Sequence, residues 1–125
     1  MTPTMAHGKI CYIEIPATDV QRSAEFYRTI FDWHVSKRGD GTLSFSDSVH
    51  QVSGAWVLGR APATEPTLVI SIMVADLAKT VQAITAHGGE IVHSAEAGAS
   101  EVFATFRDPA GNLLGIYQEA SLATG

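Results

Sequence analysis

The 125-residue sequence contains one cysteine, Cys11, so no disulfide can form within the chain. A single thiol fits a reducing compartment. Its place beside Tyr12 favours a small buried side chain over a nucleophile. No apolar run approaches the roughly 18 residues of a membrane-spanning helix. The first residues also lack the charged and then apolar segments of a secretion signal. We therefore expect a cytoplasmic protein that has no contact with a membrane.

Positive charge is scarce, with eight Lys and Arg residues against 13 Asp and Glu residues, a formal net charge of −5. The basic residues are scattered, which argues against binding to nucleic acid. The sequence also lacks the glycine-rich loops that bind nucleotides and the G-x-S-x-G turn of serine hydrolases. With 46% apolar and 17% charged residues, it fits one globular domain over residues 1–125. These absences favour a small molecule as the partner.

Residues 10–31 form the clearest unit of the chain. Apolar and polar residues alternate over residues 12–15, as in a strand that is buried on one face. Pro16 ends this pattern, and Thr18 or Asp19 can cap the helix that follows. Apolar residues then recur at steps of three and four, in the order Val20, Ala24, Tyr27 and Phe31. This spacing predicts a helix whose apolar face covers a sheet.

The same unit recurs in the second half of the chain. Asp76 lies 57 residues after Asp19 and opens a similar apolar pattern, which ends at Gly88 and Gly89. Alternating residues predict three strands after the first helix, at His34–Lys37, Thr42–Ser46 and Val52–Leu58. They predict four strands in the second half, at Thr67–Val74, Glu90–His93, Glu101–Arg107 and Asn112–Gln118. Each half therefore reads as strand, helix and three strands.

This duplication predicts an α+β fold of two βαβββ modules, at residues 9–59 and 67–118, joined by a linker at residues 60–66. One helix covers only one face of a four-stranded sheet, so the other face of each sheet should stay open. Two such sheets side by side would curve around a cleft suited to a small ligand.

Two motifs resemble the vicinal-oxygen-chelate superfamily, which includes glyoxalase I, bleomycin-resistance proteins and extradiol dioxygenases. The first is IEIPATDVQRSAEFY followed by FDW, and the second is DPAGNLLGIYQ. The resemblance covers roughly residues 9–118. It implies that the two βαβββ modules form an incomplete barrel, that the protein is a homodimer, and that a ligand lies in the concave face.

Metal-dependent members of this superfamily hold a divalent cation with His, Gln or Glu side chains. Counted along the matching motifs, the resemblance places three of these ligands at Tyr12, Val69 and Gly115. Val and Gly offer no donor atom and a neutral Tyr is a poor one. We therefore expect neither the inherited metal site nor any other cofactor.

Six residues are candidates to contact a ligand, namely Tyr12, Glu14, Phe45, Trp56, Phe103 and Tyr117. Glu14 shares a strand face with Tyr12 and, among the aromatic residues, would be partly desolvated and a candidate catalytic base or polar anchor. The alternative for Glu14 is an ion pair with Arg28, Lys9 or a partner subunit. Residues such as Trp56, Phe103 and Tyr117 belong more often to a core than to a ligand site.

The sequence leaves three functions open. The first is a glyoxalase-like protein that binds a small, partly apolar or aromatic molecule without a metal. The second is a lyase, isomerase or dioxygenase that uses Glu14 as a base or a divalent metal at shifted ligands. His34, Asp47, His50 and Glu14 are one such ligand set, and His93 is a further candidate. The third is an oligomerisation or regulatory module without a ligand.

Overall fold

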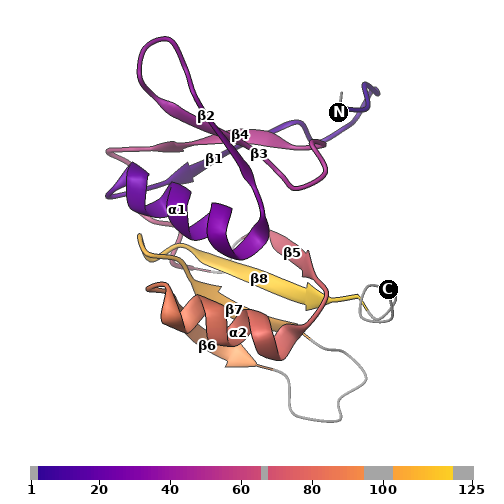
Figure 1. Ribbon diagram of the computed structural model, residues 1–125, viewed down its shortest axis with the longest axis vertical. Helices are drawn as coiled ribbons and strands as arrows, with labels where there is room; N and C mark the ends of the chain where they lie inside the picture. The colour runs from indigo at the N-terminus through magenta and orange to yellow at the C-terminus, as the bar shows by residue number, and fades with distance from the viewer. Residues whose placement is uncertain (1–2, 66–67, 95–102, 120–125) are drawn as a thin grey trace. The chain divides into compact units, whose positions relative to one another are not determined.

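A computed structural model of the protein describes residues 3–65, 68–94 and 103–119 (Figure 1). The chain divides into two compact units, Met1–Pro62 and Ala63–Gly125, which are described separately below. Neither helix in the described residues is long and apolar enough to cross a membrane.

The first unit is a four-stranded sheet with one helix. Its elements along the chain are β1 (Tyr12–Pro16), α1 (Val20–Phe31), β2 (His34–Lys37), β3 (Leu43–Ser46) and β4 (Ser53–Val57). The strand order is β1-β4-β3-β2. Strands β1 and β4 pair in parallel, whereas β4, β3 and β2 form an antiparallel meander.

The second unit repeats this topology. Its elements are β5 (Ser71–Val74), α2 (Leu77–Ala86), β6 (Glu90–Ser94), β7 (Phe103–Arg107) and β8 (Leu113–Gln118), with the strand order β5-β8-β7-β6. The predicted α+β fold of two βαβββ modules is therefore confirmed. The strand predicted from Thr67 begins only at Ser71, and Thr67, Glu101 and Val102 lie outside the described residues.

Equivalent aspartates start the two helices. Asp19 and Asp76 have extended backbones, and their Oδ1 atoms accept hydrogen bonds from the amides of Arg22 (3.1 Å) and Lys79 (3.0 Å). These bonds satisfy amides that have no carbonyl partner in the first helical turn. Of the two caps that the sequence allowed for the first helix, the structure uses Asp19.

Helix α1 covers one face of the first sheet through a cluster of aromatic rings. Tyr27 is completely buried, and its ring stacks on Trp33 with centroids 4.6 Å apart. Trp33 stacks in turn on Phe45 at 4.5 Å, and Phe45 lies 4.9 Å from Trp56. Such pairs add attraction between rings to the hydrophobic gain from burial. This cluster fixes the face of the sheet that the helix covers.

The second unit has an apolar core and a polar turn. Ile84 of α2 is buried with Phe106 and Ile116 of the sheet. At the turn into β8, the buried Asp108 accepts a hydrogen bond from the amide of Asn112 (2.9 Å). The side-chain oxygen of Asn112 accepts one from the amide of Ala63 (2.8 Å). This turn therefore anchors the beginning of the unit beside β8.

Cys11 is exposed, which contradicts the prediction of a buried side chain. It precedes β1, and β1 is an edge strand of its sheet. The backbone carbonyl of Cys11 accepts a hydrogen bond from the amide of Ser53 (3.1 Å). The carbonyl of Cys11 is therefore paired with the neighbouring strand, while the residue as a whole remains exposed.

Gly54 occupies a position of the first sheet that has no room for a side chain. A Cβ atom there would clash with the carbonyl oxygen of Ile13 and with the Phe45 ring. Gly54 keeps its register with both neighbouring strands, so the residue marks a close approach of two backbones rather than a bulge.

We predict that Gly54→Ala lowers the free energy of unfolding by about 3 kcal/mol or more, because the obstructing Ile13 oxygen belongs to the backbone and cannot rotate away. Gly39→Ala is the matched control, since a Cβ at Gly39 meets nothing within 4 Å. The control should change stability by less than about 1 kcal/mol. Urea denaturation checks both values, and equal effects of the two substitutions would contradict the close approach.

Candidate functional site

The register of the first sheet divides the predicted site residues between its two faces. Tyr12 pairs with Ser53 and Glu14 with Ala55, on the face opposite to α1. Phe45 and Ile13 both pair with Gly54, one from each side, so the three residues point to the same face. Trp56 is two residues after Gly54 and therefore also points to this face, which the helix covers. The expectation that Glu14 lies among Phe45 and Trp56 is therefore wrong, because neighbouring residues in a strand point to opposite faces.

Tyr12 meets an arginine that its strand pattern did not indicate. The Arg38 guanidinium donates a hydrogen bond of 2.7 Å to the Tyr12 hydroxyl, and Arg38 Cζ lies 6.0 Å from the centroid of the ring. The hydrogen bond to Tyr12 raises the pKa of Arg38. Because the phenol oxygen accepts this bond, its own proton remains available to an acceptor on the open face.

Glu14 pairs with Arg60, whose Nη2 lies 2.7 Å from Glu14 Oε1. Of the partners suggested by the sequence, Arg28 pairs with Glu25 instead, and no ion pair joins Glu14 to Lys9 within the described residues. A pair with a partner subunit stays a prediction. The Glu14 side chain is 43% exposed. An ion pair exposed to this degree contributes at most about 1 kcal/mol to stability.

Three exposed side chains form a row across the open face of the second sheet. Tyr117 of β8 lies between Met73 of β5 and Phe103 of β7 in the strand register. Their exposed fractions are 43%, 59% and 37%, respectively. The His93 ring lies 5.6 Å from that of Phe103 and extends the row onto β6. Helix α2 packs on the opposite face, so this row is a surface feature of the unit.

Two histidines of the alternative metal set lie together. The rings of His34 and His50 are stacked with their centroids 4.0 Å apart, and Ser46 Oγ lies 3.2 Å from His50 Nδ1. Desolvation and the nearby charge of His34 lower the pKa of His50. Asp47 instead accepts a hydrogen bond from the amide of Gln51 (2.7 Å). In the described ranges no three His, Cys, Asp or Glu side chains come together as a metal site.

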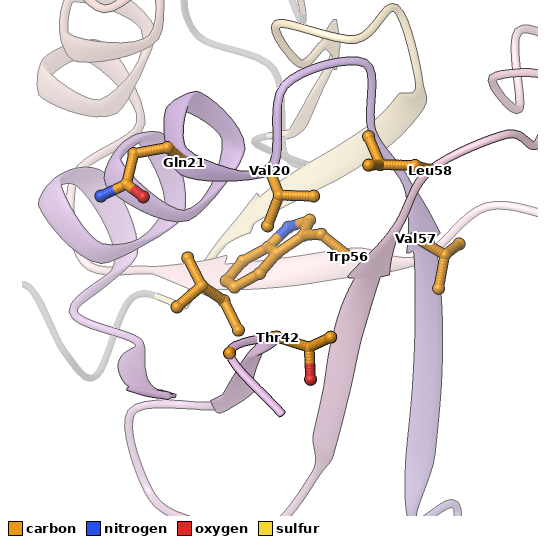
Figure 2. A pocket seen from close by; sticks show the side chains of 8 residues that line it. Val20, Gln21, Thr42, Trp56, Val57 and Leu58 are labelled. Carbon is orange, nitrogen blue, oxygen red and sulfur yellow. The ribbon is translucent and has the colours of Figure 1, made fainter. Parts of the chain in front are cut away.

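A pocket of about 510 Å³ lies in the first unit, between the first turn of α1, the start of β3 and the end of β4 (Figure 2). Its walls are formed by Val20, Gln21, Gly41, Thr42, Leu43, Trp56, Val57 and Leu58. Trp56 is 4% exposed, and its indole N–H has no hydrogen-bond partner in the described structure. A buried donor without a partner costs about 1–3 kcal/mol.

The pocket was not predicted, although Trp56 was a candidate ligand contact. The alternation of β4 indicates only that Trp56 and Val57 point to opposite faces. That Thr42 and Leu43 lie near the first turn of α1 depends on the path of the β2–β3 connection. No local sequence pattern carries that information.

Comparison with known protein families decides the identity of the fold. The family model described as Glyoxalase/Bleomycin resistance protein/Dioxygenase superfamily matches residues 9–116. The chain belongs to this superfamily. A glyoxylase-like domain-containing protein from Didymella fabae is 32% identical over 121 residues, which cover 88% of this chain and 93% of the relative.

Solved structures share the fold at low sequence identity. The fosfomycin resistance protein FosX from Listeria monocytogenes has a TM-score of 0.73 at 16% identity, covering 93% of this chain and 94% of its own. TnmS3, an antibiotic binding protein from Streptomyces sp. CB03234, has a TM-score of 0.66 at 18% identity, covering 94% and 100%. At these identities the likeness establishes the fold alone.

Two positions where the glyoxalase superfamily pattern expects metal ligands lie side by side on the second sheet. A Cβ at Gly115 would lie 3.5 Å from Val69 Cγ1 and 2.8 Å from Ser71 Oγ. Gly115 shares the open face with Tyr117 because the two residues are two apart in β8. Neither Val69 nor Gly115 supplies a donor atom, so this part of the site does not fit a divalent cation.

The His34 and His50 pair should make stability depend on pH. Because the pKa of His50 is lowered from its usual 6.5, the folded protein binds this proton less readily than the unfolded chain. The stabilising contribution is complete above about pH 6.5 and is lost as the pH falls through the lowered pKa. We predict that His50→Asn removes this loss, and Asn also tolerates the left-handed backbone at His50, where φ is 57°.

Urea midpoints measured from about pH 8 to about pH 5 check this prediction. His87→Asn is the control, because His87 is an exposed histidine at the end of α2. The control should retain the pH dependence of the unmodified protein. An unchanged pH dependence in His50→Asn would contradict the assignment.

Proposed function

We propose that this protein binds a small, partly apolar or aromatic molecule and that binding requires no metal. The observation that carries the proposal is the exposed row of Met73, Tyr117 and Phe103 on the open face of the second sheet. These three large side chains leave 37–59% of their surface in contact with water. A ligand that covers them would gain hydrophobic free energy from burying this surface. Aromatic faces also stack on a planar ligand, and a methionine adapts to its outline.

Two further observations support a binding function. Val69 and Gly115, beside this row, present apolar surface where the metal-dependent members need donor atoms. In addition, TnmS3 is described as an antibiotic binding protein and has this fold. The second point is an analogy of fold, and a fold hosts more than one function.

Tyr12 and Glu14 are the polar candidates on the open face of the first sheet. Tyr12 can donate its phenol proton while Arg38 holds its oxygen, and Glu14 offers a carboxylate beside Arg60. Phe45 and Trp56 belong to the core on the other face, so the proposal assigns them no contact with this ligand. A homodimeric state and a cytoplasmic location, which the sequence predicted, remain parts of the proposal.

Saturation-transfer NMR with a panel of single-ring and two-ring phenols, amines and carboxylates tests the proposal. We expect bound compounds whose affinity falls about tenfold in Tyr117→Ala, because the substitution removes one stacking face and its buried area. Val49→Ala is the control, since Val49 is exposed (52%) in the turn between β3 and β4. A panel without binders, or equal affinities for both variants, would contradict the proposal.

The second candidate function is enzymatic, and the observation that favours it is the Glu14 carboxylate on an open face. In that case Glu14 would act as a base, or a divalent metal would bind at ligands that differ from the superfamily pattern. We predict instead that protein purified without chelator carries no stoichiometric Ni, Zn, Mn or Fe. We also predict that Glu14→Gln changes the free energy of unfolding by less than about 1 kcal/mol, because the ion pair is exposed.

Elemental analysis and urea denaturation check these two outcomes. Stoichiometric metal would favour the enzymatic alternative. Since Glu14→Gln should leave the fold intact, loss of any turnover found in the panel would assign the reaction to the carboxylate. Turnover that survives the substitution would exclude Glu14 as the base.

A further inference from the structure

The pocket beside α1 is formed by residues of the first unit alone, whereas the exposed row proposed above belongs to the second unit. Most of the side chains around it are apolar, and none of the eight lining residues is charged (Figure 2). A charged ligand would lose its hydration here without gaining a charged partner. The lining therefore selects for a neutral molecule. The volume of about 510 Å³ falls within the range of small-molecule sites.

The donors and acceptors around the pocket narrow the class of ligand. Three lining side chains carry an N–H or O–H group, those of Gln21, Thr42 and Trp56. The Thr42 hydroxyl donates to Asp40 Oδ1 at 2.6 Å, and Gln21 is exposed to solvent. Trp56 therefore supplies the buried donor, and its N–H has no partner within the described structure. An indole nitrogen donates and does not accept, so the missing partner must be an acceptor atom.

Val20 and Trp56 line the same pocket, and their side chains are drawn next to each other in Figure 2. In Figure 2 the indole nitrogen is on the edge of the Trp56 ring nearest to Val20, the first residue of α1. Val20 is half-buried and cannot accept a hydrogen bond. Because Val20 also lines the pocket, a small displacement of this side chain would connect the pocket with the N–H.

We propose that this pocket is a second ligand site, which takes a small neutral molecule with an apolar body and one acceptor oxygen, as in an aryl ketone. The oxygen accepts the Trp56 indole hydrogen bond, and the apolar body lies against Leu43 and Leu58. Binding moves Val20 away from the nitrogen. The site depends neither on the exposed row of the second sheet nor on a metal.

The test compares two probes of nearly equal shape, acetophenone and α-methylstyrene, which differ in a carbonyl oxygen and a methylene group. The chain has two tryptophans, so protein with ¹⁵N-labelled tryptophan gives two indole resonances, which Trp33→Phe assigns. We expect acetophenone to shift the Trp56 indole proton downfield in a saturable manner, with a smaller change at Trp33. The hydrocarbon should bind about two- to tenfold more weakly, as the loss of one hydrogen bond implies, and should cause no downfield shift.

Two substitutions of Val20 test the geometry. Val20→Phe fills the space over the nitrogen and should abolish the acetophenone shift, whereas Val49→Phe, at an exposed turn of the same unit, should preserve it. Val20→Ala uncovers the nitrogen and should accelerate solvent exchange of the Trp56 indole proton without any ligand. This exchange rate depends only on whether Val20 shields the indole nitrogen. It therefore tests the position of Val20 even if acetophenone is not a suitable ligand.

Three results would overturn the proposal. The first is that acetophenone causes no saturable shift at Trp56 in either the unmodified protein or Val20→Ala. The second is that acetophenone and α-methylstyrene cause equal shifts. The third is that the acetophenone shift persists in Val20→Phe. None of them bears on ligands of the exposed row, because the substituted residues belong to the first unit. Conversely, if no compound of the aromatic panel bound to the exposed row, the acetophenone experiment at Trp56 would still be informative.

Discussion

Each helix packs on one face of a four-stranded sheet, and the free face of each unit is a direct consequence of that packing. In the first unit the rings of Tyr27, Trp33, Phe45 and Trp56 fill the covered face. Since side chains alternate along a strand, burying Ile15 and Trp56 leaves Tyr12, Glu14 and Val57 on the opposite side. The packing of the core therefore determines which side chains of the first sheet lie on its open face.

The sequence predicted the elements well because their signals are local. Asp19 and Asp76 stand directly before apolar helical stripes, and the alternation of Leu43 with Phe45 lies within one strand. The partners of the polar residues were not predictable in this way. Arg38 is 26 residues from Tyr12 and Arg60 is 46 from Glu14, so both contacts depend on the path of the chain between them. Assigning Phe45 and Trp56 to a face likewise required the strand register.

The superfamily explains the fold, while the side chains of this chain determine what its surfaces can bind. Val69 and Gly115 offer a cation no donor, whereas Met73, Phe103 and Tyr117 present an apolar, partly aromatic surface. On the first sheet, arginines already occupy the hydroxyl of Tyr12 and one carboxylate oxygen of Glu14. Recognition by shape and stacking fits these groups better than chelation does.

Gly54 and Gly115 lie in equivalent strands, β4 and β8, yet they constrain the chain differently. The obstacle above Gly54 includes the Ile13 carbonyl oxygen, which is part of the backbone, so the first sheet admits no side chain there. The obstacle nearest to Gly115 is the Ser71 hydroxyl, the end of a side chain that can rotate. One codon change at Gly115 could thus introduce a carboxylate on the open face without a new backbone path. The size of a side chain at this position of the open face is therefore limited by neighbouring side chains and not by the β8 backbone.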